Sequence, residues 1–208
     1  MVVTILTGES LRDRKKLAAM KRVQWEAVRR FVEVGFDKVT VEEIADAADV
    51  SAVSVYRWFG TKDGIVIWDE FDPPILDTVA ERLATEPPLD AVRNALVALL
   101  DRVYDRERSL ALERVRLIFK EPTLRAASER NMRALRRALE RQFCERAGMT
   151  ELHARVTAGV AVGLLEIGIE RWQLEDGRRQ LGVLITEAFE ALAAATRSSR
   201  PVPTVGLS

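Results

Sequence analysis

The sequence predicts an all-α protein, with an N-terminal three-helix domain that contains a helix-turn-helix, followed by a C-terminal helical bundle. Apolar side chains such as Leu17, Met20 and Val23 recur at helical spacing through most of the chain. No segment shows the strict alternation of apolar and polar residues that indicates a half-buried strand. Helix terminators such as Gly35 and Gly148 divide the apolar pattern into separate helices.

Bulk composition indicates a soluble, cytoplasmic protein. The 208 residues suffice for one large domain or two small ones, and the net charge of zero says nothing about a nucleic-acid partner. Cys144 is the single cysteine, which excludes an intrachain disulfide and suggests a reducing compartment. The first ten residues lack the pattern of a signal peptide. The longest nearly uncharged stretch, Val156 to Ile169, is shorter than the roughly 20 residues that span a bilayer, so no membrane partner is expected.

Residues 40–59 carry the clearest local pattern, two short helices joined by a tight turn. Thr40 and Glu43 form the spacing of a capping box, which predicts a first helix over Val41 to Ala47. Ser51 is a good N-cap for a second helix over about 52–58. The second helix of such a unit can enter the major groove of DNA.

The rest of the chain is expected to be helical apart from its ends and a linker at 85–88. Further helices are predicted over about 10–34, 62–71, 74–84, 89–105, 110–119, 124–147, 151–174 and from after Gly177 to 196. The predicted organisation is a disordered arm at 1–9, a DNA-binding domain at 10–60, a ligand-binding and dimerisation domain at 61–197, and a disordered tail at 198–208.

The N-terminal third resembles the tetracycline-repressor (TetR) family of bacterial regulators. The matching residues are Gly35-Phe36, Thr40-Val41, Ile44-Ala45, Ala48, Val50-Ser51, Ser54, Tyr56, Trp58-Phe59 and Lys62-Asp63. One departure is Asp49, which stands where the family usually has glycine at the helix–helix turn. Asp tolerates a left-handed backbone less well than Gly, so a slightly strained turn is expected.

The resemblance implies a homodimer that binds a double-stranded DNA operator and a small-molecule effector. By position, Thr40, Tyr56 and Lys62 would contact phosphates. The groove-facing residues would be Ser51, Ala52, Val53, Ser54 and Arg57. Arg57 is the strongest candidate for a base contact, since a guanidinium can bind guanine bidentately. Trp58 and Phe59 are expected to pack the DNA-binding helices onto the helix that begins at Lys62.

A fainter resemblance links the C-terminal half to an actinobacterial subgroup that includes regulators of mycofactocin biosynthesis. It rests on Asp69 to Pro73, Arg116-Leu117-Ile118 to Pro122, and Glu170-Arg171-Trp172 with Asp176. This resemblance implies an acyl-coenzyme A as a possible effector.

The effector site is expected between the helices of the C-terminal bundle. The candidate wall residues are Trp68, Phe71, Leu100, Tyr104, Phe119, Leu139, Phe143 and Trp172. Each of them can equally be an ordinary core residue. The lining suits an apolar or amphipathic ligand, and an acyl-coenzyme A would also need cations from a set comprising Arg114, Arg116, Arg133, Arg136 and Arg137. A solvated arginine-rich face is the alternative for that set.

The apolar stretch Val156 to Ile169 predicts a helix that is covered on both sides. Gly159 and Gly163, four residues apart, would permit close approach of a partner helix. With the last helix it would form a four-helix dimer interface across a two-fold axis.

Nothing in the sequence predicts an enzyme, a metal site or a cofactor. His153 and Cys144 are the only members of their types and lie nine positions apart. Glu166 is one acid in an apolar helix without a partner base, and a structural carboxylate is the simpler interpretation. The sequence therefore predicts a ligand-responsive regulator, a repressor released from a palindromic operator. The alternative is a helical acyl-chain or lipid carrier with a vestigial DNA-binding module.

Overall fold

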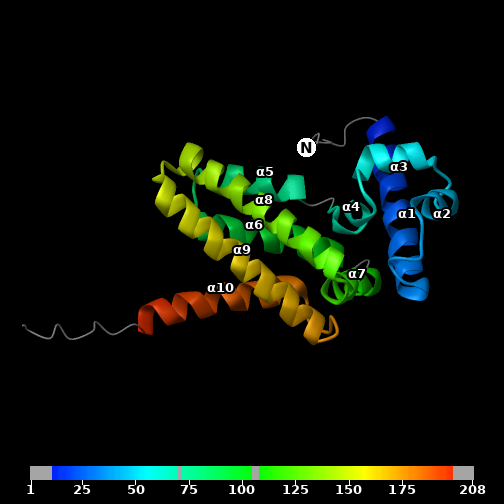
Figure 1. Ribbon diagram of the computed structural model, residues 1–208. Coiled ribbons are helices and arrows are strands. Elements are labelled where there is room, and N and C mark those ends of the chain that lie inside the picture. The colour runs from blue at the N-terminus through cyan, green and yellow to red at the C-terminus, as the bar shows by residue number, and fades with distance from the viewer. Residues whose placement is uncertain (1–10, 70–71, 105–107, 199–208) are drawn as a thin grey trace, which may run out of the picture.

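The computed structural model describes residues 11–69, 72–104 and 108–198, which form helices and no strand (Figure 1). The helices are α1 (Leu11–Val34), α2 (Val41–Ala47), α3 (Ala52–Phe59), α4 (Lys62–Ile67), α5 (Asp72–Arg82), α6 (Pro88–Tyr104), α7 (Arg108–Lys120), α8 (Pro122–Ala147), α9 (Glu151–Leu174) and α10 (Leu181–Ser198). The all-α prediction is confirmed for this part of the chain.

Helices α1 to α4 form an N-terminal unit around one apolar core. Phe31, Ile44 and Val55 are almost fully buried in it. The same core includes Leu117 of α7 and Leu124 of α8, so it continues into the rest of the chain. In Figure 1, α7 accordingly lies beside α1 at the junction of the two parts.

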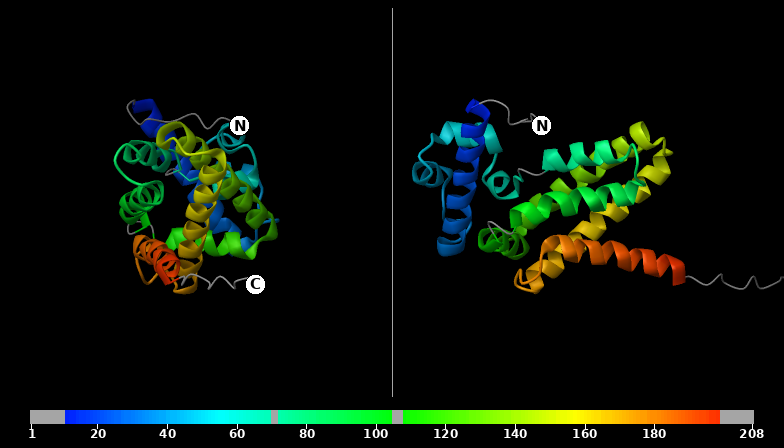
Figure 2. Two further views of the ribbon diagram at one scale, coloured as in Figure 1. Left: turned by 90° about the vertical axis from the view of Figure 1, so that its left-hand side faces the viewer. Right: turned by 180° about the vertical axis from the view of Figure 1, so that it is seen from behind.

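Helices α5 to α10 form the C-terminal bundle, in which α9 lies between α8 and α10 (Figure 2). Its core contains Phe143, Trp172 and Ile185, each essentially inaccessible to solvent. Gly168 permits the contact between α9 and α10, because a Cβ there would lie 2.7 Å from Ile185 Cγ1. By length and composition alone α9 resembles a membrane span, but in this fold one face of it is packed inside the bundle.

The region after Lys62 differs from the prediction. Helix α4 ends at Ile67 with Trp68 as its C-cap, whereas a helix to Phe71 was expected. Pro73 and Pro74 lie in the first turn of α5 and do not interrupt a longer helix. Proline is tolerated there because first-turn amides have no intrahelical acceptor.

The turn between α2 and α3 has the predicted left-handed residue. Asp49 has φ 53°, and its neighbour Val50 donates its N–H to Ala45 O at 3.0 Å. The turn is therefore closed by a backbone hydrogen bond even though an aspartate occupies it. The predicted terminal arm (1–9) and most of the predicted tail (198–208) lie outside the described residues.

Candidate DNA-binding face and ligand cavity

Helix α3 presents three of the predicted DNA-contacting side chains on one exposed face. Val53 is 75% exposed, Tyr56 is 48% exposed, and Arg57 is also exposed. Val55 and Phe59 occupy the opposite, buried face and fix the rotation of the helix. The arrangement leaves a phenol and a guanidinium available to a ligand outside the protein.

The remaining predicted contact residues of the helix pair lie at helix starts. Thr40 and Glu43 form the complete capping box, with Thr40 N donating to the Glu43 carboxylate at 2.7 Å. Ser51 Oγ accepts from Ser54 N at 3.2 Å, and the two hydroxyls lie 2.9 Å apart. Ala52 is half-buried in the first turn of α3. These caps orient α2 and α3, and a phosphate contact by Thr40 stays a prediction.

Lys62 points inward in this structure. Its ammonium donates to Phe36 O at 2.8 Å and to Val39 O at 3.2 Å, and it lies 4.5 Å from the centroid of the Phe36 ring. Two of its three N–H donors thus hold the loop before α2 against the start of α4. The predicted phosphate contact by Lys62 remains untested, and the geometry gives this side chain a structural role.

Phe59 joins α3 to the end of α4, as the sequence predicted. Its ring packs edge-on against Trp68, with the centroids 5.7 Å apart, and against Trp58 at 6.4 Å. The orientation of α3 therefore depends on where the end of α4 is held.

The end of α4 is held from both parts of the molecule. Gln24 of α1 is the buried polar residue of the described chain, and its amide donates to Ile65 O at 2.9 Å and Trp68 O at 2.6 Å. Arg114 of α7 donates to the same Trp68 carbonyl at 3.0 Å and pairs with the Asp69 carboxylate at 2.7 Å. We call these four residues (Gln24, Trp68, Asp69 and Arg114) the α4 junction.

Sequence reasoning missed the α4 junction. Gln24 lies four residues after Met20 and one turn before Val28, inside the buried stripe of α1. A polar residue on this buried stripe indicates a buried hydrogen bond, since buried polar groups in proteins are hydrogen-bonded, and this feature could have predicted the junction.

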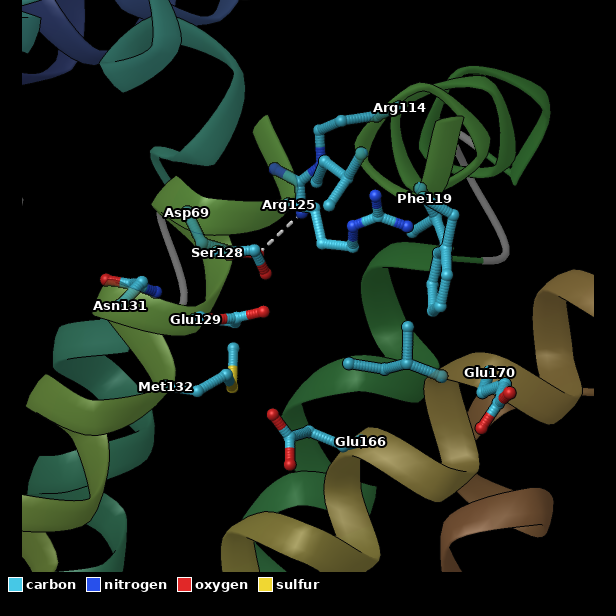
Figure 3. Close-up of a pocket in the computed structure, with 13 residues that line it drawn as sticks. Asp69, Arg114, Phe119, Arg125, Ser128, Glu129, Asn131, Met132, Glu166 and Glu170 are labelled. Atoms are coloured by element: carbon cyan, nitrogen blue, oxygen red, sulfur yellow. Dashed lines mark hydrogen bonds and ion pairs between the residues drawn. The ribbon is translucent and has the colours of Figure 1, made fainter. Parts of the chain in front are cut away.

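A cavity of about 280 Å³ opens beside the α4 junction, between α7, α8 and α9 (Figure 3). Its apolar lining comes from Val115, Ile118, Phe119, Met132 and Ile169. Its polar lining comes from Asp69, Arg114, Arg125, Ser128, Glu129, Asn131, Glu166 and Glu170. Asp69 and Arg114 thus belong both to the cavity wall and to the contact that holds α4.

Of the predicted effector-site residues, Phe119 lines this cavity. Leu139 borders a much smaller apolar void of about 10 Å³, and Leu100, Phe143 and Trp172 are packed in the bundle core. Trp68 packs against Phe59 and belongs to the α4 junction. Phe71 lies outside the described residues, as does the side chain of Tyr104.

Glu166 faces the cavity from α9, opposite Glu129 of α8 (Figure 3). Partial burial raises the pKa of Glu166, the Glu129 carboxylate raises it further, and Arg136 acts in the opposite direction. Within the described chain, the side chains of Glu166 and of Glu170, one helical turn further along α9, make no hydrogen bond or ion pair. The cavity therefore has two carboxylates whose acceptors are available.

The surface of α9 that faces away from the bundle carries a stripe of apolar and small residues. Leu152, Val156, Ile167 and Leu174 are between 48% and 69% exposed. Gly163 lies on the same stripe, and a Cβ there would meet no atom within 4 Å. We call these five residues, with Gly159, the α9 stripe.

Comparison with known proteins places this geometry in a family. Residues 26–67 match the model of bacterial regulatory proteins of the tetR family, and residues 86–197 match the model of the MftR C-terminal domain. The chain belongs to the TetR family of bacterial regulators. This is a family of transcriptional regulators, which bind DNA operators and small-molecule effectors and act as dimers.

Two curated TetR-family relatives illustrate the similarity. The transcriptional regulator TcmR of Streptomyces glaucescens is 30% identical over 149 residues, which cover 68% of this chain and 66% of TcmR. A candidate mycofactocin biosynthesis regulator, MftR of Mycobacterium tuberculosis, is 25% identical over 195 residues, or 89% of this chain and 95% of MftR.

Solved structures share the fold at lower identity. A SmeT–triclosan complex superposes with a TM-score of 0.55 at 16% identity, covering 86% of this chain and 91% of SmeT. FadR of Bacillus subtilis in complex with stearoyl-CoA gives 0.50 at 19% identity, covering 83% and 96%. At such identities the likeness concerns the TetR-family fold.

Proposed function

We propose that this TetR-family regulator is a repressor that a small apolar or amphipathic effector releases from a palindromic operator. The observation that carries the proposal is that Asp69 and Arg114 line the cavity and also hold the end of α4. A ligand in the cavity would act directly on residues that position α3. Acting on DNA in this way, the protein would work in the cytoplasm.

DNA recognition would use α3 of both subunits of a homodimer. The α9 stripe and the adjoining face of α10 form the proposed dimer interface, because exposed apolar side chains there are otherwise uncovered. Two copies of α3 would enter successive major grooves about 34–36 Å apart. Arg57 would read a base edge, and Tyr56 would contact a phosphate.

Release would follow from competition at the α4 junction. An effector that binds Asp69 or Arg114 weakens their ion pair, and with it the hydrogen bond from Arg114 to Trp68 O. The end of α4 and the attached Phe59 would then be free to shift, which changes the spacing of the two α3 helices. The effector acts only through its different affinities for the two arrangements.

The structural relatives support a small effector without naming it. SmeT was solved with triclosan and FadR of Bacillus subtilis with stearoyl-CoA, an apolar compound and an amphipathic one. Both ligands have an apolar body, which the Phe119 side of the cavity would accommodate.

The decisive experiment selects operators from random DNA with the purified dimer and then measures affinity at several salt concentrations. Arg57→Ala should cost about 1–3 kcal/mol and relax preference at one base position. Tyr56→Phe should weaken binding to all DNA sequences by the same factor. Arg141→Ala, which removes an exposed arginine of α8, is the matched control. Absence of any selected sequence would favour the lipid-carrier alternative.

A further inference from the structure

We propose that the effector is a compact amphiphile with a positively charged group, which the carboxylates of Glu166 and Glu170 recognise. This inference rests on the proposed function, since it takes the cavity between α7, α8 and α9 as the effector site. It adds the charge of the ligand, which neither the family nor the relatives decide.

The cavity has an apolar side that would hold the body of such a ligand. Phe119 is 40% exposed although it is aromatic, and Met132 and Ile169 line the same space. In Figure 3, Phe119 and Met132 lie on different sides of the opening, with Glu166 below them. An apolar body placed there would cover surface that the chain leaves accessible to water.

The charged lining has an excess of carboxylates. Asp69 and Arg114 neutralise each other at 2.7 Å, which leaves Arg125 against Glu129, Glu166 and Glu170. Two further arginines lie near this edge and are already engaged with carboxylates. Both line an adjoining hollow with Glu129 and Glu166: Arg133 lies 3.7 Å from Glu129, and Arg136 lies 3.6 Å from Glu140, which Arg155 also approaches at 4.0 Å. Even with Glu129 counted as neutralised, two carboxylates face one guanidinium.

The effect of neighbouring charges on the pKa of Glu166 agrees with this excess of carboxylates. Among the charges that shift the pKa of Glu166, the carboxylate of Glu129 has a larger effect than the guanidinium of Arg136. The electrostatic environment at Glu166 is therefore negative on balance and favours a cation. A ligand ammonium would satisfy the acceptors of Glu166 and Glu170, which are one helical turn apart.

The same features disfavour an acyl-coenzyme A. Its phosphates would have to lie near a cavity edge where carboxylates predominate. The volume of about 280 Å³ also lies at the small end of ligand pockets. Of the arginines that the sequence offered as phosphate contacts, Arg114, Arg133 and Arg136 are already engaged with carboxylates, Arg116 pairs with Asp176, and Arg137 does not line the cavity.

The test uses two amphiphiles with the same chain and opposite heads, octylammonium and octanesulfonate, both below their micelle concentrations. Binding is followed by NMR of protein labelled with ¹³C at the methionine methyl groups. Met132 reports on the cavity, and Met20 in the core of the N-terminal unit serves as the internal reference. The ammonium should shift the Met132 signal at roughly tenfold lower concentration than the sulfonate.

Variants then assign the preference to the carboxylates. The double variant Glu166→Gln, Glu170→Gln should bind the ammonium about tenfold more weakly and should bind the sulfonate with unchanged or higher affinity. Both positions are exposed, so folding should be retained. The matched control is Glu145→Gln with Glu151→Gln, two exposed carboxylates on α8 and α9 outside the cavity.

The outcomes separate this inference from the proposed function. Equal binding of the two amphiphiles, or tighter sulfonate binding, at Met132 overturns the charge assignment and leaves the cavity as effector site. If both amphiphiles reduce operator binding while the Met132 signal stays unmoved, the cavity itself is the wrong site. An unchanged ammonium affinity in the glutamine variant also overturns the assignment.

Discussion

The N-terminal unit and the C-terminal bundle are both helical, but they obtain their geometry differently. In the N-terminal unit, α2, α3 and α4 each begin with a hydroxyl side chain that caps the helix, at Thr40, Ser51 and Thr61. In the bundle, the 26-residue α8 begins at Pro122 without a side-chain cap, and the Thr150 cap of the 24-residue α9 is long, with His153 N 3.5 Å from the Thr150 hydroxyl. Local signals fix the short helices, whereas the long ones depend on packing.

The two parts also differ in what they leave unfilled. The core of the N-terminal unit is filled around Phe31 and Ile44, and the exposed face of α3 carries Val53, Tyr56 and Arg57. The bundle contains the cavity and carries the uncovered α9 stripe. The part that places side chains on DNA thus has a filled core, which α7 and α8 help to complete, whereas the part that responds to other molecules leaves a cavity and an uncovered face.

The largest expected effect comes from placing a charge on the α9 stripe. Gly163→Glu adds a side chain where a Cβ meets no atom within 4 Å, so the monomer should fold normally. In a dimer the carboxylate would be buried without a partner, so size-exclusion chromatography with light scattering should show a monomer. Operator affinity should fall at least about 100-fold, since each monomer contacts one half-site.

The control for this variant is Ala84→Glu, an exposed position after α5. It should remain dimeric and bind the operator as the unmodified protein does. A dimeric Gly163→Glu protein would show that the interface lies elsewhere on the bundle.

The next effect concerns the only polar side chain buried in the described core. Gln24→Leu removes the side-chain donor to the Ile65 carbonyl and one of the two donors to the Trp68 carbonyl, which Arg114 still holds; the loss should cost about 1–3 kcal/mol of folding free energy. It should also weaken operator binding, because α4 loses its tie to α1. Urea unfolding and operator titration measure the two effects.

A glutamine of the bundle provides the matched comparison. Gln142 of α8 donates to Leu76 O of α5 at 3.0 Å, the same type of bond within one part of the molecule. Gln142→Leu should lower stability while operator affinity stays unchanged. Equal loss of operator binding in both variants would mean that the α4 junction has no special role in DNA binding.

A smaller effect is expected at the turn between α2 and α3. Asp49 has φ 53°, where a residue with a Cβ is strained and glycine is not. Asp49→Gly should therefore stabilise the N-terminal unit by about 0.5–1 kcal/mol, and Asp49→Ala should destabilise it by a similar amount. Thermal unfolding of the two variants measures this, and a destabilised glycine variant would show that the turn is relaxed with aspartate.

These differences explain what the sequence could predict. The capping box at Thr40 and the cap at Ser51 follow from residues within four positions of one another, and the left-handed Asp49 follows from the family resemblance. The inward position of Lys62 and the bonds of Gln24 join segments 23 to 44 residues apart, and no local pattern contains them. The predicted effector lining includes Leu100, Phe143 and Trp172, which fill the core, because a sequence does not show which apolar side chains leave space between helices.

The smallest expected effect is an opposite response of the two parts to acid. The Thr40 backbone N–H and hydroxyl donate to Glu43 and lower the pKa of its carboxyl. Its folded pKa lies below the unfolded one, so this contribution to stability is present above the unfolded pKa and is lost as pH falls through the folded value. Burial raises the pKa of Glu166, so its contribution is present below the unfolded pKa and is lost as pH rises through the folded value. Urea unfolding between about pH 3 and pH 7 should therefore show that Glu43→Gln flattens the acid loss of stability, while Glu166→Gln steepens it. If both variants changed the pH dependence of the unfolding free energy in the same direction, the opposite environments of the two carboxylates would be contradicted.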